Sequence, residues 1–127
     1  MEDKKRILII EDDIVTQSLY RHILEGQGYE VFTGSSIVEA VALTHRQKPD
    51  IAILDIILDE TQRYGYNGID AGVIVSKIAP GTKLIFISSQ DEMLSWLDGF
   101  DVPHVSRRLK PVGAKELLRM VSQALNN

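Results

Sequence analysis

The sequence contains no cysteine, which excludes a disulfide framework, a thiolate metal site and a cysteine nucleophile. It has no apolar run that approaches the roughly 18 residues of a membrane-spanning helix. The charged residues 1–6 lead into an aliphatic stretch that is too short for a signal-peptide core. The net charge of -4 comes from 18 acidic and 14 basic side chains that are intermixed, which argues against direct nucleic-acid binding. We therefore expect a cytoplasmic protein with no membrane association.

The length and the pattern of short apolar runs predict one α/β domain over residues 1–127. Short β-branched runs alternate with amphipathic stretches about five times, which is typical of a parallel sheet with helices on both faces. The expected strands are 6–10, 30–33, 51–54, 83–88 and 104–109, and the expected helices are 14–25, 36–46, 69–78, 92–97 and 114–125. Right-handed crossovers place the first, third and fourth strands at the centre of a doubly wound, five-stranded sheet with about five helices.

Two helix starts carry a capping signal. Asp13 is a candidate N-cap for the first helix. Ser36 and Glu39 match the capping box that opens a helix, because a serine at the cap and a glutamate three residues later can each bond a free backbone N–H.

Four of the apolar runs end at polar side chains. These side chains are Glu11 and Asp12, Asp55, Ser88, and Lys110. Open α/β sheets gather such residues at the rim formed by the carboxyl ends of their strands. We therefore expect an acidic pair, a lone carboxylate, a hydroxyl and an ammonium group at one rim.

This set of groups suits phosphoryl transfer to a carboxylate. Mg²⁺ takes six oxygen ligands, which Glu11, Asp12 and Asp55 can supply in part. A transferred phosphoryl group spreads negative charge over three oxygens, which a metal ion and a cation can offset. Lys110 is placed for that role, and the Ser88 hydroxyl can bond the bound group. The sequence predicts a phosphoryl-accepting, magnesium-binding pocket.

Each piece taken alone also has a purely structural interpretation. The acidic residues 11–13 suit a solvated helix start, which the helix dipole favours. An aspartate after a strand is often a cap, Ser88 suits a turn, and Lys110 suits the end of a strand. Their occurrence together, in order and each at a strand end, favours the pocket.

The segments ILIIEDD, PDIAILD, LIFISS and LKP resemble, in order and spacing, the response-regulator receiver domains of two-component signalling. The resemblance covers essentially the whole chain and implies a CheY-like, flavodoxin-like sheet of order 2-1-3-4-5. It implies that Asp55 is the phosphorylated residue. It also implies the roles of the other site residues. Glu11 and Asp12 would bind Mg²⁺ together with the Ile57 backbone carbonyl, Ser88 would supply the switch hydroxyl, and Lys110 would be the conserved-type lysine.

The resemblance further implies a phosphoacceptor, not an enzyme, with at most slow self-catalysed phosphorylation and dephosphorylation. Its phosphoryl group would come from a histidine kinase or phosphotransfer protein, and its output would be a changed affinity for a protein partner. Two points stay open. Phosphorylation can also pair two copies of the chain, and the chain can be a stand-alone protein or a piece of a larger regulator.

The sequence departs from the usual receiver pattern at three places. Asp59 stands where a proline is usual, and the loop from Asp59 to Asn67 is enlarged, with Tyr64 and Tyr66 available to cover the pocket or meet a partner.

The other two departures concern signal output and phosphoryl lifetime. Arg107 stands three residues before the lysine, where many receivers have an aromatic residue. We therefore expect either that the signal leaves through a different surface or that Arg107, with Arg108, pairs with an acidic partner. In receiver domains, the side chains two residues after the acceptor and two residues after the hydroxyl influence the loss of the phosphoryl group. In this chain they are Ile57 and Gln90, and Ile57 cannot orient an attacking water. We therefore expect slow loss of the phosphoryl group.

Three other protein classes share parts of the pattern. An aspartyl-nucleophile phosphatase needs a second aspartate two residues after the first, where this chain has Ile14 and Ile57. A flavodoxin-type flavin carrier needs a hydroxyl- and glycine-rich phosphate loop, and the acidic residues 11–13 would repel that phosphate. A pseudo-receiver that binds partners without phosphorylation stays open, and magnesium titration distinguishes it.

Overall fold

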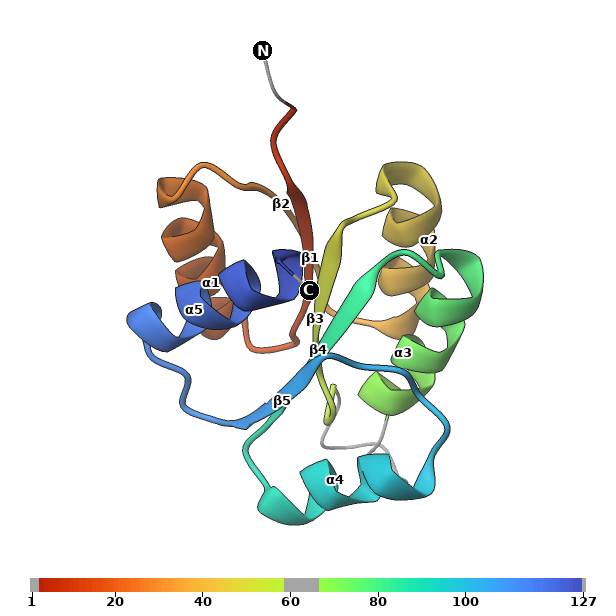
Figure 1. Ribbon diagram of the computed structural model, residues 1–127. Helices are drawn as coiled ribbons and strands as arrows, with labels where there is room; N and C mark the ends of the chain where they lie inside the picture. Colours follow the sequence, from red (N-terminus) through yellow and green to blue (C-terminus); the bar gives the residue numbers. More distant parts are fainter. Residues whose placement is uncertain (1–2, 59–66, 127) are drawn as a thin grey trace.

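The computed structural model describes residues 3–58 and 67–126, which form a parallel sheet with helices on both sides (Figure 1). In chain order, the elements are β1 (Arg6–Ile10), α1 (Ile14–Gly26), β2 (Glu30–Gly34), α2 (Ile37–Gln47), β3 (Ile51–Asp55), α3 (Asn67–Ile78), β4 (Lys83–Ser88), α4 (Asp91–Trp96), the 3-10 turn η1 (Leu97–Gly99), β5 (Ser106–Leu109) and α5 (Ala114–Leu125). All strand pairs are parallel, and the strand order is β2-β1-β3-β4-β5. The predicted fold class and strand order are confirmed.

The central strand β3 is buried along its whole length, as its continuous apolar run predicts for a strand covered on both faces. In the ladder, Leu54 lies beside Ile10 of β1 on one side and Phe86 of β4 on the other. The residues that follow these strands therefore emerge side by side at one rim of the sheet.

The sheet separates two apolar cores. Helices α1 and α5 cover one face, and α2 and α3 cover the other (Figure 1). Successive side chains of a strand point to opposite faces, so Ile7 and Ile9 pack with the α1 and α5 residues whereas Leu8 and Ile10 pack on the other side. Burial of each such aliphatic side chain stabilises the fold by about 1.5–3 kcal/mol.

Helix α3 packs closely on β4 because it has a glycine at the contact. A Cβ atom on Gly72 would lie 2.4 Å from Cζ of Phe86 and 3.3 Å from Cδ1 of Leu54. The Phe86 ring also meets the ring of His104 edge to face, with centroids 5.6 Å apart. Phe86 is therefore enclosed on both sides, and it is fully buried.

Both predicted helix caps are present. The Asp13 side chain accepts hydrogen bonds from the backbone N–H and the hydroxyl of Thr16 at the start of α1. The Ser36 hydroxyl accepts from the Glu39 N–H at 3.2 Å. The Glu39 carboxylate reaches back one residue further than in the standard capping box, to the N–H of Ser35 at 3.2 Å.

The main differences from the predicted boundaries lie between β4 and β5. Strand β5 begins at Ser106 and not at residue 104. His104 is turned back on the preceding segment, because its Nδ1 donates to the Val102 carbonyl at 2.9 Å. The short helix α4 is present and continues directly into η1.

Most of the predicted enlarged loop lies outside the described residues. Residues 59–66, which include Asp59, Tyr64 and Tyr66, are outside the described part of the chain. The expected role of the two tyrosines in covering the pocket or meeting a partner therefore stays a prediction. Asn67 begins α3, two residues before the predicted start. Across the described helices, none combines the length and hydropathy that a membrane span requires.

Candidate functional site

The rim at the carboxyl ends of β1 and β3 holds the candidate acceptor, Asp55. Asp55 is the last residue of β3, and Glu11 directly follows β1. The Glu11 N–H donates to the Gly34 carbonyl at 3.0 Å, which continues the β1–β2 ladder past the end of the strand. Because Ile10 and Leu54 are partners in the ladder, Glu11 and Asp55 lie next to each other.

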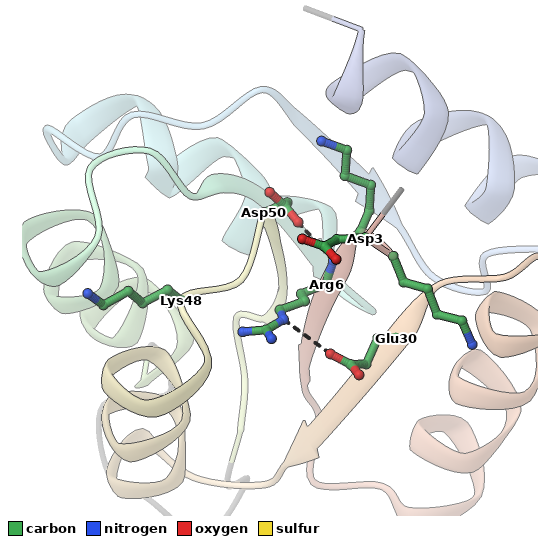
Figure 2. A pocket seen from close by; sticks show the side chains of 7 residues that line it. Asp3, Arg6, Glu30, Lys48 and Asp50 are labelled. Carbon is green, nitrogen blue, oxygen red and sulfur yellow. Dashed lines mark hydrogen bonds and ion pairs between the residues drawn. The ribbon is translucent and has the colours of Figure 1, made fainter. Parts of the chain in front are cut away.

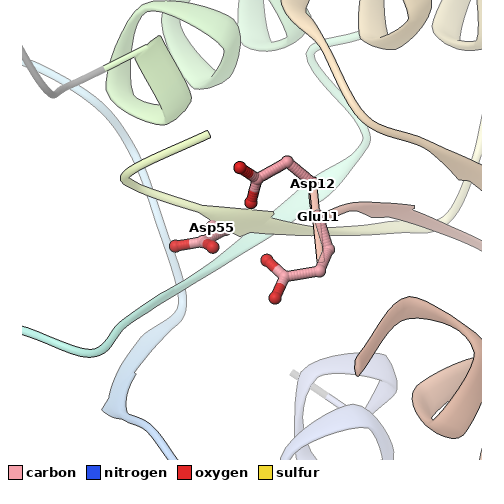
Figure 3. Close-up of side chains that lie close together, drawn as sticks. All are labelled: Glu11, Asp12 and Asp55. Atoms are coloured by element: carbon pink, nitrogen blue, oxygen red, sulfur yellow. The ribbon is translucent and has the colours of Figure 1, made fainter. Parts of the chain in front are cut away.

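Three carboxylates converge on one space at this rim (Figure 3). Glu11, Asp12 and Asp55 each place a carboxylate oxygen within 4.8 Å of the others. Glu11 is completely buried and Asp55 is 4% exposed, whereas Asp12 is open to solvent. The Oε2 atom of Glu11 is buried and has no hydrogen-bond partner in the described part of the chain. The space is thus closed on the Glu11 side and open beside Asp12.

Lys110 spans two of these carboxylates. Its Nζ lies 2.8 Å from Asp55 Oδ2 and 2.6 Å from Glu11 Oε1. Its backbone N–H donates to the Ser88 carbonyl at 2.7 Å, which fixes the loop after β5 against the end of β4. Ser88 is fully buried at the same rim, and its hydroxyl accepts from the Gln90 N–H at 3.1 Å. The structure brings the predicted acidic, acceptor, hydroxyl and lysine positions to one rim.

Burial and close charges alter the proton affinity of the Glu11 and Lys110 side chains. Burial raises the pKa of Glu11 to about 9, and the adjacent Asp55 carboxylate adds to this effect while Lys110 opposes it. Burial alone would lower the pKa of Lys110, but hydrogen bonds to Asp55 and Glu11 outweigh it and leave that pKa above its ordinary value. The lysine therefore stays a cation in the pocket, and the metal-free site disfavours the ionised form of Glu11.

Two neighbours of Asp55 complete its surroundings. The Ile57 N–H donates to Asp55 Oδ1 at 3.2 Å, which places the predicted carbonyl-bearing residue directly beside the acceptor. On the other side, Gly68 of α3 donates its N–H to the Ile56 carbonyl at 2.9 Å. A Cβ atom at Gly68 would lie only 1.8 Å from the Asp55 carbonyl oxygen. The sequence analysis did not predict this contact. The glycine of the Asn67-Gly68 pair was the available signal, because glycine is the residue that allows two backbone segments to approach closely.

The acidic space fits a small, hard divalent cation. All its side-chain ligands are oxygens, which Mg²⁺ prefers over nitrogen and sulfur. The unpartnered Oε2 of Glu11 is a buried acceptor that a cation can satisfy. The exposed side at Asp12 leaves room for the water ligands that Mg²⁺ usually keeps.

The two arginines before Lys110 pair within the chain. Arg107 donates to the Leu94 carbonyl at 2.6 Å and to Asp98 Oδ1 at 2.5 Å, so it joins β5 to α4 and η1. Arg108 lies 2.7 Å from Glu116 of α5. Their predicted pairing with an acidic partner stays a prediction, and it would have to compete with these contacts.

A second hollow, of about 440 Å³, lies at the opposite end of the sheet (Figure 2). Charged residues line it: Asp3, Lys4, Lys5, Arg6, Glu30, Lys48 and Asp50. Arg6 pairs with Glu30 at 3.1 Å, and its backbone N–H donates to Asp50 Oδ2 at 2.8 Å. These contacts join the amino ends of β1, β2 and β3, which gives the hollow a structural role.

Comparison with known proteins gives the same family from sequence and from structure. Residues 7–122 match the response regulator receiver domain family. The chain is 30% identical over 122 residues to an uncharacterized transcriptional regulatory protein, YbdJ, of Bacillus subtilis, covering 96% of this chain and 51% of that protein. It is 27% identical to the alkaline phosphatase synthesis transcriptional regulatory protein PhoP of the same organism, covering 95% of this chain and 48% of that protein.

A solved structure agrees with these relatives. A CheY-like response regulator receiver domain protein from Methanospirillum hungatei superimposes with a TM-score of 0.84 at 27% identity, covering 98% of this chain and 95% of that one. The chain spans about half the length of the two curated relatives named above. Fold, site and sequence therefore agree that this chain belongs to the response regulator receiver domain family, a family of phosphoacceptor domains rather than enzymes.

Proposed function

We propose that the protein accepts a phosphoryl group on Asp55 from a histidine kinase or phosphotransfer protein, in a Mg²⁺-dependent reaction in the cytoplasm. The observation that carries this proposal is the position of Lys110, whose ammonium group bonds both Asp55 and Glu11 at the rim. A carboxylate with an adjacent fixed cation and two further carboxylates is suited to hold the charge of a transferred phosphoryl group.

In this reaction, a carboxylate oxygen of Asp55 attacks the phosphorus of a phosphohistidine. The new O–P bond forms as the N–P bond breaks, and the electron pair of that bond stays on the donor imidazole. Lys110 is placed to offset charge on the transferred group. Ser88 lies on the neighbouring strand β4, where its hydroxyl can turn to bond a phosphoryl oxygen.

Glu11, Asp12 and Asp55, with the Ile57 carbonyl, would hold Mg²⁺. The bound ion would neutralise charge on the transferred oxygens. Because burial raises the pKa of Glu11, a bound cation would displace a proton from it, and apparent Mg²⁺ affinity should rise with pH.

The output we propose is a phosphorylation-dependent change in affinity for a protein partner. The two curated relatives named above are described as transcriptional regulatory proteins and are about twice as long as this chain. The partner can accordingly be a separate protein, another part of a longer regulator, or a second copy of this chain. Rearrangement at Ser88 and Lys110 would shift the population of conformations near α4 and β5.

Intact-protein mass spectrometry tests this function directly. The protein is incubated with acetyl phosphate, with and without Mg²⁺, as wild type, as Asp55→Asn and as the exposed control Asp101→Asn. We expect one added phosphoryl group that requires Mg²⁺, disappears in Asp55→Asn and persists in the control. No addition to folded wild type would favour the pseudo-receiver alternative.

The lifetime of the phosphoryl group is a second measurable consequence. Ile57 packs against the core on the α2 and α3 side of the sheet and offers no polar group to orient a water, so we propose slow hydrolysis. Replacement by asparagine should accelerate the decay of the purified phosphoprotein. If wild type loses the group as fast as Ile57→Asn, this assignment is wrong.

A further inference from the structure

A glutamine of α1 reaches back to the turn that carries the acidic pair. Nε2 of Gln17 lies 2.9 Å from the Glu11 carbonyl oxygen and 3.0 Å from the Gly34 carbonyl oxygen at the end of β2. The side-chain amide is partly buried and joins three elements: α1, the turn after β1, and β2.

The chemistry of these contacts fixes the orientation of the amide. Both partners are backbone carbonyl oxygens, so only the NH₂ group, with its two hydrogens, can bond both. The flipped amide would place Oε1 of Gln17 against two acceptors. The two hydrogen bonds therefore depend on a donor group and not on the bulk of the side chain.

Hydrogen bonds hold the backbone on both sides of the Glu11 Cα atom. The N–H of Glu11 donates to Gly34, which holds the preceding peptide plane. The Glu11 carbonyl that Gln17 holds belongs to the next peptide plane, which also contains the nitrogen of Asp12. With both planes held, the φ and ψ angles of Glu11 are restricted, and with them the direction of its Cα–Cβ bond and the position of the Asp12 Cα atom.

The helix itself does not need these bonds. Asp13 already caps α1 through Thr16, and Tyr20 and Leu24 anchor the helix in the core. The Gln17 bonds are additional to helix capping and act on the backbone of the acidic turn. This separates their effect from the formation of α1.

We propose that Gln17 is a positioning residue for the divalent-cation site: its amide pre-sets the backbone that aims Glu11 and Asp12 at Asp55. This inference rests on the proposed function, because it assumes that the three carboxylates bind Mg²⁺. Partners that hold metal ligands in place typically contribute 10- to 100-fold to metal affinity. For Gln17, which acts through the backbone, we expect a value near the lower end, about ten-fold.

Two variants separate hydrogen bonding from packing. Gln17→Met keeps the length of the side chain without its donors, and Gln17→Glu keeps the shape but directs carboxylate oxygens at two carbonyls. Gln123→Met, at an exposed position of α5, is the control for a glutamine-to-methionine change within a helix. Urea unfolding identifies the folded fraction of each protein.

Two readouts are taken on folded protein. Calorimetric titration with MgCl₂ gives the Mg²⁺ dissociation constant, which should rise about ten-fold in Gln17→Met, further in Gln17→Glu, and less than two-fold in Gln123→Met. NMR hydrogen exchange without metal should show faster exchange at the Glu11 amide in both Gln17 variants, beyond any change in global unfolding.

The outcomes distinguish this inference from the function on which it rests. Unchanged Mg²⁺ affinity in folded Gln17→Met overturns the positioning role, even if the Glu11 amide exchanges faster, because the residue would then only stabilise the turn. Absence of Mg²⁺ binding in the wild type overturns both this inference and the metal-dependent function. If Gln17→Met does not fold, Gln17→Glu decides by the same two measurements.

Discussion

Replacing Glu11 by glutamine should stabilise the metal-free protein at neutral pH. Glu11 is fully buried beside Asp55, and this environment raises its pKa from 4.5 to about 9. In the unfolded chain the same carboxyl group ionises near its ordinary pKa. Folding at pH 7 therefore requires Glu11 to take up a proton, whereas glutamine is neutral in both states and has a similar shape.

The size of the effect follows from the difference between pH and the unfolded-state pKa. Because the folded-state pKa is raised, the wild type loses no stability below about pH 4.5 and loses progressively more as pH rises toward 9. Each pH unit in that window corresponds to about 1.4 kcal/mol for one proton. At pH 7 the advantage of Glu11→Gln should approach about 3 kcal/mol, as an upper value before the pocket relaxes.

Urea unfolding in EDTA at pH 5, 6, 7 and 8 measures this advantage. The free energy of unfolding of Glu11→Gln minus that of wild type should grow with pH, whereas Glu92→Gln, at an exposed site, should show no such trend. With saturating Mg²⁺, wild type should gain more stability than Glu11→Gln, because the variant has lost a charged ligand. A difference that stays constant from pH 5 to 8 would refute the reasoning.

Three further substitutions test other contacts. Gly68→Ala should lower the free energy of unfolding by about 2 kcal/mol or more, since its methyl group has no space against β3; urea unfolding measures this loss. Arg107→Ala should lower the free energy of unfolding by about 1 kcal/mol and speed hydrogen exchange in α4, and high salt should weaken the contribution of the ion pair with Asp98. Equal exchange rates in the variant and the wild type would show that Arg107 does not hold α4 against β5. Thr82→Val should cost about 1–2 kcal/mol in thermal unfolding, because the Pro49 carbonyl loses its buried partner.

Periodicity and strand-end chemistry predicted most of the fold and the candidate site. The order of the strands follows from short connections and right-handed crossovers, which leave few arrangements for five alternating units. The rim positions of Asp55 and Lys110 follow from the same rule, because they occur at strand ends in the sequence. The predicted Asp13 cap of α1 is also present, since a capping hydrogen bond joins residues that are close in the chain.

The features that sequence reasoning missed depend on contacts between distant segments. Gln17 has no special sequence context, and its two partners come from the end of β1 and the end of β2. The late start of β5 depends on His104, which turns toward a neighbouring carbonyl and the Phe86 ring. The partners of Arg107 depend on where α4 lies against the sheet, which no periodicity encodes.

The contact between Gly72 and Phe86 has a consequence for how this chain can vary. The ring occupies the volume that any side chain at position 72 would need, with the nearest ring atom 2.4 Å from the site of a Cβ. A larger residue at 72 therefore requires a smaller one at 86, so the two positions should evolve as a pair. Gly72→Ala should be poorly tolerated alone and partly rescued by Phe86→Leu, a reciprocal size relation that sequences of close homologues should display.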